Sequence, residues 1–370
     1  MKVIKFKIIS GIFLSLLFSA CGKQTPKQSL DIDINAQMVS TNPCDASAAC
    51  SKSFSDALVK FKNDGSDEFC DELMKRKDGD LAICEVEIRN PKYENLILSC
   101  KNNIMNRLDQ LVAKRNEGLR IHADVFSTKE IGLGFKLPTQ IQIRDTSKGY
   151  LAVEGGVKQK QVILTFDDGP EPINTRSILR TLQEADAKAH FFQLGMRVQE
   201  SPEVTKLAAS MGHSIGNHSW NHPNMRSISF EDAAAQIKKT QSLLLKVLGW
   251  VDPFFRFPFG NRTAALDQML AENKMADFYW AIDSNDWRMV NEDKTVRTNL
   301  QVVTDTINQL DKKGRGIILM HDIHRRTAEL LPELLRLISE KGYETVMLQA
   351  ANVDLRSNPP LVMSERQNLN

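Results

Sequence analysis

The stretch ILTFDDGPEP, residues 163–172, runs a series of strand-forming apolar residues directly into two adjacent carboxylates. The apolar run predicts a buried strand, and Gly169 and Pro170 mark its end, so Asp167 and Asp168 fall where the strand gives way to a loop. Neighbouring carboxylates repel each other, and folding alone has no use for that repulsion. The pair therefore indicates a metal ion or a catalytic role.

From residue 160 onward, strand-like and helix-like segments alternate. The apolar strand candidates are QVILTF, AHFFQLG, GHSIGNH, PFFRFPFG, FYWAID, GIILMHD and ETVMLQ. Ser201 before Pro202, Ser229 before Asp232, and Thr327 mark helix starts. This alternation predicts an α/β fold of parallel strands with crossover helices, most simply a barrel related to the TIM type. In such barrels, functional groups gather where the strands end.

Functional side chains follow one strand candidate after another. After the two aspartates come His218 and His222, Arg256, Asp283 and Asp286, and His321 with Asp322. Because parallel strands of a barrel all end at the same face, these side chains are expected to share one site.

His218 and His222 stand four residues apart in GNHSWNHPN. On a helical turn, both imidazoles point to one side and can hold one ion. A pair of surface histidines is the alternative, but an aspartate from another strand end is available as a third ligand. Two histidines and one carboxylate leave positions open for water and substrate, which is typical of a catalytic metal site.

The motifs TFDDGP, HSWNH, RFPFG, DSNDW and ILMHD occur in an order and spacing that resemble the polysaccharide deacetylases, the NodB-homology or carbohydrate esterase family 4 enzymes. The resemblance covers roughly residues 160–350. It implies a distorted (β/α)7 barrel and a hydrolase of linear amides that removes acetyl groups from N-acetylated sugars, occasionally from acetylated xylan. It also implies one divalent metal, most often Zn²⁺, with Co²⁺, Mn²⁺ or another divalent ion as alternatives.

The same resemblance assigns roles position by position. Asp168, His218 and His222 resemble the metal ligands of the family, and Asp167 resembles its general base. His321 resembles the general acid that donates a proton to the departing sugar amine, for which a protonated imidazole is suited.

Five further residues resemble positions that support these groups. Arg256 resembles the arginine that orients the base and keeps it ionised, and Asp286 the carboxylate that raises the pKa of the acid histidine. The backbone N–H of Phe259 is expected to stabilise the oxyanion. Trp287 is expected to line the pocket for the acetyl methyl, with Leu319 beneath it; a core tryptophan and a core leucine are the alternatives.

Other polar residues near the motifs are interpreted separately. His190 and His213 are expected to be structural residues rather than ligands. Asp283 either supports its loop or touches the substrate, and Asp322 and His324 either assist the acid or face solvent.

The N-terminus carries targeting features. Residues 1–20 combine three lysines with an apolar run and predict a signal peptide, too short for a stable spanning helix. LFSAC resembles the lipobox of bacterial lipoproteins, so Cys21 is expected to carry a lipid; simple secretion is the alternative. The protein is therefore expected on the cell envelope, facing the periplasm or on the outer membrane, held to the membrane by this anchor. Polar residues 21–43 predict a flexible tether.

Residues 44–150 are interpreted as a small N-terminal domain of unknown role, before a deacetylase domain at 155–350 and a polar tail at 351–370. The domain holds the remaining cysteines, which are Cys44, Cys50, Cys70, Cys84 and Cys100. Outside the cytoplasm they predict disulfides with one thiol left over, and zinc binding is the alternative. Within it, LAICEVEI predicts a strand, and YLAV a strand of either domain.

The composition and the net charge limit the classes of partner that the protein can bind. With 42% hydrophobic and 25% charged residues and a formal net charge of +2, the chain is globular and lacks the field needed to capture nucleic acid. An envelope lipoprotein meets peptidoglycan first, so this glycan is the expected substrate, followed by chitin-like oligomers or an exopolysaccharide. An ester deacetylase and a non-catalytic wall-binding protein are the alternative functions.

Overall fold

The computed structural model describes residues 43–64, 68–77, 81, 84–88, 91–115, 133–152 and 154–351. The predicted signal peptide and Cys21 lie outside these residues, as does all but one residue of the predicted tether and of the predicted tail. Among the helices of the described ranges, none is long and apolar enough to cross a membrane.

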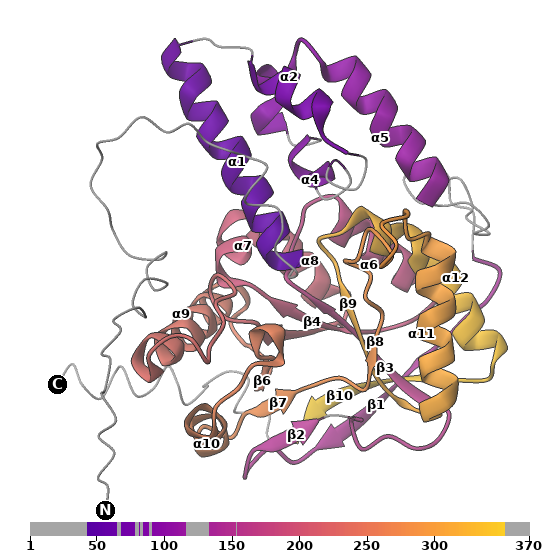
Figure 1. Cartoon of the computed structure of the whole chain (residues 1–370). Helices are drawn as coiled ribbons and strands as arrows, with labels where there is room; N and C mark the ends of the chain where they lie inside the picture. The colour runs from indigo at the N-terminus through magenta and orange to yellow at the C-terminus, as the bar shows by residue number, and fades with distance from the viewer. Residues whose placement is uncertain are drawn as a thin grey trace, which may run out of the picture. The chain divides into compact units, whose positions relative to one another are not determined.

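The N-terminal part of the described chain is helical. Its elements are α1 (Pro43–Asp64), α2 (Glu68–Lys75), α4 (Glu85–Ile88), the 3-10 helix η1 (Pro91–Ile97) and α5 (Lys101–Arg115). They share a hydrophobic core that includes Phe54, Leu73 and Ile104. We call residues 43–115 the helical region (Figure 1).

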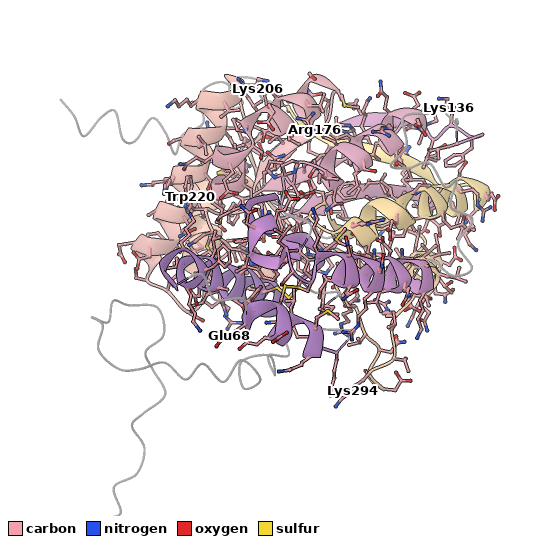
Figure 2. All side chains as sticks on the ribbon, turned by 90° about the horizontal axis from the view of Figure 1, so that it is seen from above. Glu68, Lys136, Arg176, Lys206, Trp220 and Lys294 are labelled. Atoms are coloured by element: carbon pink, nitrogen blue, oxygen red, sulfur yellow. A yellow bond between two sulfur atoms is a disulfide. The ribbon has the colours of Figure 1, made fainter. Side chains whose placement is uncertain are left out.

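Two disulfides cross-link the helical region, as Figure 2 shows, and confirm that part of the sequence prediction. Cys50 is joined to Cys84, and Cys70 to Cys100. Because zinc needs free thiolates, these four cysteines are not zinc ligands. The side chain of Cys44 is outside the described set.

The strand predicted for LAICEVEI, residues 81–88, is wrong. Residues 85–88 form helix α4, and the Ile88 N–H donates to the Cys84 carbonyl at 3.0 Å, a helical contact. Among the side chains of this segment that the structure describes, the buried apolar ones are Leu81, Cys84 and Ile88. Their spacing of three and four is helical.

The rest of the described chain is an α/β fold (Figure 1). Its strands are β1 (Thr139–Arg144), β2 (Tyr150–Ala152), β3 (Gln161–Asp167), β4 (His190–Gln193), β5 (Ser214–Asn217), β6 (Phe254–Phe255), β7 (Ala276–Phe278), β8 (Ile282–Asp283), β9 (Gly316–His321) and β10 (Glu344–Ala350). Its helices are α6 (Asn174–Glu184), α7 (Gly195–Glu200), α8 (Pro202–Ser210), α9 (Phe230–Leu248), η2 (Pro258–Gly260), α10 (Ala264–Glu272), α11 (Asn299–Lys313) and α12 (Arg325–Glu340).

Seven parallel strands follow one another in the order β8-β9-β3-β4-β5-β6-β7. Among the described residues no ladder joins β7 to β8, so the ring is open there. This confirms the expected α/β fold and its distorted seven-stranded barrel. The segment FYWAID, residues 278–283, is not one strand: Phe278 ends β7 and Ile282–Asp283 form β8, on either side of this opening.

Two strands from before residue 155 join the same sheet. β1 pairs with β10, and β2 pairs with β7, both in parallel. Tyr150–Ala152, the described residues of YLAV, therefore supply a strand to the sheet that also contains the barrel strands. The division of the chain into domains stays a prediction.

The pleat of the strands decides which side chains enter the barrel. In β3, Val162, Leu164 and Phe166 pack into the core under the helices, whereas Ile163 belongs to a separate core with Phe192 and other residues. Side chains alternate between the two faces of a strand, so Thr165 and Asp167 lie on the side of Ile163. The last inward position of β3 is thus Asp167, at the carboxyl end.

Candidate active site

A pocket of about 210 Å³ opens at the carboxyl ends of the strands. It is lined by Asp167, Asp168, His218, His222, Phe257, Phe259, Trp280, Asp283, Trp287, Leu319, His321, Ile323 and His324. These residues come from several strand ends that lie far apart in the sequence, as the barrel rule predicts. Eight of the ten residues predicted for the site are among them, and Arg256 and Asp286 lie directly behind.

Asp167 is held from behind by Arg256. The Nη1 of this fully buried arginine donates to Asp167 Oδ1 at 2.7 Å and to Thr165 Oγ1 at 2.8 Å. Its other nitrogens donate to the carbonyls of Phe278 and Tyr279. Burial raises the pKa of Asp167 to about 6, against the opposing charges of Arg256 and His321. The carboxylate is therefore fixed in place and poised near neutral pH.

Asp168, His218 and His222 bring three ligand atoms within 4.8 Å of one another. The Nε2 atoms of both histidines lie 3.5 Å from Asp168 Oδ1. That oxygen is buried and has no hydrogen-bond donor among the described residues. A buried carboxylate oxygen without a donor is costly, and a divalent cation would satisfy it.

The chemistry of these side chains also fits a metal ion. The Nδ1 of His218 lies 2.7 Å from the Arg256 carbonyl, to which it donates, so the lone pair of Nε2 faces Asp168. Burial lowers the pKa of both histidines to about 4, so both are neutral at pH 7, the form that binds metals. Burial opposes the charge on Asp168, but His222, His321 and His218 outweigh it and hold its pKa below the ordinary value.

The backbone is strained at both ends of this ligand set. Asp168 has φ of 74° and His222 has φ of 61°, in the left-handed region that non-glycine residues seldom adopt. Such conformations cost about 1–3 kcal/mol each and persist where the surrounding structure enforces them, often at functional sites.

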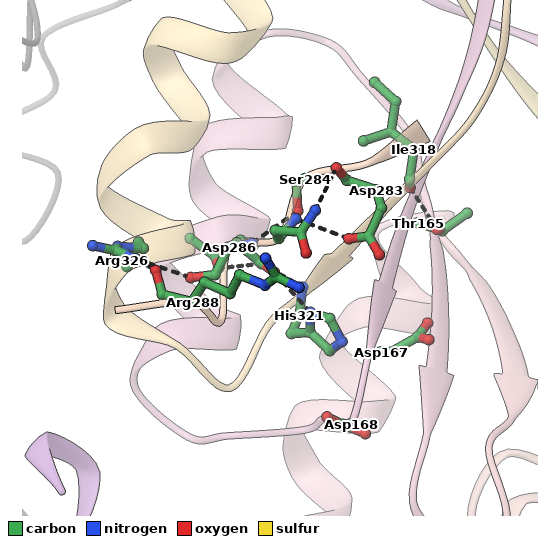
Figure 3. A network of polar contacts seen from close by, with 12 residues as sticks. Thr165, Asp167, Asp168, Asp283, Ser284, Asp286, Arg288, Ile318, His321 and Arg326 are labelled. Carbon is green, nitrogen blue, oxygen red and sulfur yellow. Dashed lines mark hydrogen bonds and ion pairs between the residues drawn. The ribbon is translucent and has the colours of Figure 1, made fainter. Parts of the chain in front are cut away.

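At the end of β9, beside Asp167, His321 is oriented by Asp286 (Figure 3). Its Nδ1 and its backbone N–H each donate to this carboxylate at 2.7 Å. Burial disfavours the charged imidazole, but the charge and hydrogen bond of Asp286 outweigh it and raise the pKa of His321 to about 10. His321 is thus a protonated donor at neutral pH, and Figure 3 shows its ring directed toward Asp167 and Asp168.

Thr327 departs from the role that its sequence context suggested. Helix α12 begins at Arg325 rather than at Thr327. The Thr327 hydroxyl instead donates to Asp286 Oδ2 at 2.6 Å. The residue therefore supports the carboxylate that orients His321.

The remaining polar candidates divide into pocket residues and residues behind it. Asp283 and His324 line the pocket. Asp322 is buried behind Gly169 and accepts from Thr175 at 2.6 Å. A Cβ at Gly169 would lie 2.1 Å from this carboxylate, so only glycine fits there.

His190 and His213 do not line the pocket. His190 is buried, and its Nε2 accepts from the Leu348 N–H at 3.0 Å. His213 accepts from the Ala189 N–H through Nδ1. Burial lowers the pKa of each to about 3, so both act as neutral acceptors within the fold.

Sequence reasoning missed several residues of the site. Phe257, Trp280 and Ile323 line the pocket, Thr165 accepts from Arg256, and Thr327 donates to Asp286. Phe257 lies within the motif RFPFG, and Ile323 directly follows the motif ILMHD, so both could have been predicted from the sequence. The two threonines contact residues distant in sequence, and no local pattern points to those contacts.

Replacing Asp286 by asparagine is expected to lower kcat of the reaction catalysed at this site by about 10- to 100-fold, the usual cost of losing a carboxylate that orients a functional histidine. It also removes the charge that raises the pKa of His321, which then falls toward its ordinary value of 6.5. Because the donor must be protonated, activity will be lost at lower pH than in the wild type. The measurement is kcat as a function of pH, with Asp293→Asn, at an exposed position on the same loop, as control. If the loss of activity at high pH occurs at the same pH in Asp286→Asn as in the wild type, Asp286 does not raise the pKa of His321.

Comparisons with known proteins identify the family of this chain. The sequence profile of the family described as polysaccharide deacetylase matches residues 154–278, which include Asp168, His218 and His222 as well as Asp167 and Arg256. A solved peptidoglycan deacetylase from Bdellovibrio bacteriovorus superposes with a TM-score of 0.77 at 34% identity, covering 89% of this chain and 96% of that one.

Two curated relatives each match about half of this chain. The peptidoglycan-N-acetylmuramic acid deacetylase of Bacillus subtilis is 36% identical over 188 residues, 51% of this chain but only 38% of that protein. A peptidoglycan-N-acetylglucosamine deacetylase of Bacillus cereus is 33% identical over 192 residues, 51% of this chain and 69% of that protein. The chain belongs to the polysaccharide deacetylase family.

Proposed function

We propose that the protein is a metal-dependent deacetylase that hydrolyses the acetamide of N-acetylated sugars in peptidoglycan and releases acetate. One observation carries the proposal. A carboxylate with a pKa of about 6 and an imidazole with a pKa of about 10 line the same pocket as a ligand set for a metal ion. A base, an acid and an ion site together are the parts that amide hydrolysis requires.

Asp168, His218 and His222 would hold the ion, most often zinc in proteins with such ligands. When bound, the ion would polarise the acetamide carbonyl and favour ionisation of the attacking water.

Asp167 would accept the proton of the attacking water. Arg256 contacts only Oδ1 of this carboxylate in the described structure, which leaves Oδ2 directed to the ligand side, 3.6 Å from His218 Nε2. The arginine thus fixes the base in one rotamer and favours its ionised form.

His321 would donate its Nε2 proton to the amide nitrogen as the carbon–nitrogen bond breaks. The water oxygen becomes part of acetate, and the sugar leaves as an amine. Asp286 holds the opposite nitrogen of the ring, so the proton-bearing Nε2 faces the pocket. His321 and Asp167 end the neighbouring strands β9 and β3 and line the same pocket, so the donor and the base can both reach one bound amide.

The acetyl methyl would lie against the apolar part of the pocket, formed by Trp287, Leu319 and Ile323. Phe259 lines the pocket, and its ring lies 4.5 Å from that of His222. Its N–H is the proposed donor to the oxyanion.

One observation and one proposal support peptidoglycan as the substrate. The relatives named above are described as peptidoglycan deacetylases, one for N-acetylmuramic acid and one for N-acetylglucosamine. The lipid anchor proposed at Cys21 would hold the enzyme on the envelope beside this polymer.

The test is acetate release by the purified protein from peptidoglycan, from N-acetylglucosamine oligomers and from acetylated xylan, in parallel. The proposal predicts the largest kcat/KM on peptidoglycan. Faster release from the oligomers or the xylan would reassign the substrate. Binding to peptidoglycan without release from any polymer would favour a wall-binding protein instead.

A further inference from the structure

The helical region is joined to the barrel by a buried ion pair. Nε and Nη2 of Arg115, the last residue of α5, donate to Glu329 Oε2 in α12 at 3.2 and 2.8 Å. Both side chains are only 3% exposed. Removing one partner of a buried pair leaves the other charge uncompensated, so the neighbouring groups have to rearrange.

Glu329 also accepts hydrogen bonds from two other residues of the barrel. Its Oε2 also accepts from Asn299 Nδ2 at 3.2 Å, and its Oε1 accepts from Arg325 at 2.8 Å. Asn299 in turn accepts from Arg326 Nε at 2.9 Å through Oδ1. The carboxylate and the amide therefore fix the first turn of α12 from one side.

Arg326 contacts the loop that carries Asp286. We call residues 284–298, between β8 and α11, the acid loop. The fully buried guanidinium of Arg326 donates to the Arg288 carbonyl, and its Nη1 lies 3.5 Å from the Asp286 carbonyl (Figure 3). It also donates to the carbonyl of Arg297. The first turn of α12 thus holds both ends of the acid loop.

The helical region also contacts the acid loop directly. Val296 packs against the hydrophobic core of the helical region. The next residue, Arg297, donates to the Asn285 carbonyl at 2.7 Å, one position before Asp286. The loop is therefore held by the helical region at a second point, independent of the ion pair.

We propose that Arg115 is a positioning residue for the catalytic acid, and that the helical region serves the reaction by bracing the acid loop. Loss of the ion pair frees Glu329 to turn toward Arg325 and loosens the hold of Arg326 on the loop. Asp286 then orients His321 less well. The proposal rests on the deacetylase function proposed above.

The test is Arg115→Met in the full zinc-loaded protein, with two readouts. Networks of this kind change coupling by about two- to thirtyfold, so kcat on peptidoglycan is expected to fall within that range, with KM changed less. The proton resonance of His321 Nδ1–H is expected to shift or broaden, because its bond to Asp286 is perturbed. A variant with wild-type resonance and wild-type kcat would overturn the proposal.

The matched control is Arg107→Gln in the same helix, whose arginine donates to the Met74 and Arg76 carbonyls within the helical region. Arg107→Gln should leave kcat and the His321 resonance unchanged. If it lowers kcat as much as Arg115→Met does, the effect comes from a general loosening of the helical region and not from positioning by Arg115. If Arg115→Met does not fold, Arg115→Lys replaces it, because lysine keeps the charge but loses the two-nitrogen contact. The resonance needs no turnover, so it tests positioning even if the wild type releases no acetate.

Discussion

Asp167→Asn is expected to lower kcat for acetate release by about 10²- to 10⁴-fold, the usual contribution of a positioned base. Asparagine keeps the size of the side chain and an oxygen for Arg256, but it cannot take a proton from water. Because Asp167 is outside the proposed ligand set, the variant should bind one zinc as the wild type does. The measurement is single-substrate kinetics on peptidoglycan with the metal content determined in the same preparation.

The matched control for this variant is Asp277→Asn. Asp277 is also a buried aspartate that accepts from an arginine, Arg262, at 2.8 Å, and burial raises its pKa to about 6. It lies in β7 and does not line the pocket. Loss of activity in Asp167→Asn alone identifies the base, whereas retention of more than about a tenth of the wild-type kcat would exclude that role.

His222→Gln is expected to weaken zinc binding by at least about 100-fold, since it removes one of three protein ligands. Acetate release should fall in parallel when free zinc is buffered at a level that saturates the wild type. His222 is chosen because the His218 ring also bonds the Arg256 carbonyl, so its loss would disturb the base as well. Zinc affinity is measured by calorimetric titration of the metal-free protein.

His324→Gln is the comparison for the ligand. His324 lines the same pocket but is not one of the three residues whose ligand atoms converge. Its substitution should leave zinc affinity within about twofold of the wild type. Equal weakening by both substitutions would show that the ligand set is wrongly assigned.

Most of the candidate site could be predicted from the sequence because its residues follow strand ends. The alternation of β3 places Asp167 inward, and parallel pairing with β9 sets His321 beside it in register. Arg256 follows β6 in the same way. Short motifs thus predicted which residues lie in the pocket, whereas the roles of these residues as base, ligands and acid stay predictions.

The sequence did not predict contacts made between distant parts of the chain. Thr327 has the local appearance of a helix start, yet its hydroxyl bonds to Asp286, 41 positions earlier. The segment LAICEVEI resembles a strand, but its residues 85–88 form a helix, and Cys84 is bonded to the distant Cys50. The bond between Arg115 and Glu329 spans 214 positions, and no local pattern encodes it. Tertiary packing overrides local propensity at each of these places.

The most direct test of the central claim is a titration of the metal-free protein with zinc, followed by acetate release from peptidoglycan. The account predicts no release without metal, a linear rise with added zinc and a plateau at one ion per chain, held by Asp168, His218 and His222. Release at the full rate by the metal-free protein, or no release once one zinc is bound, would contradict it.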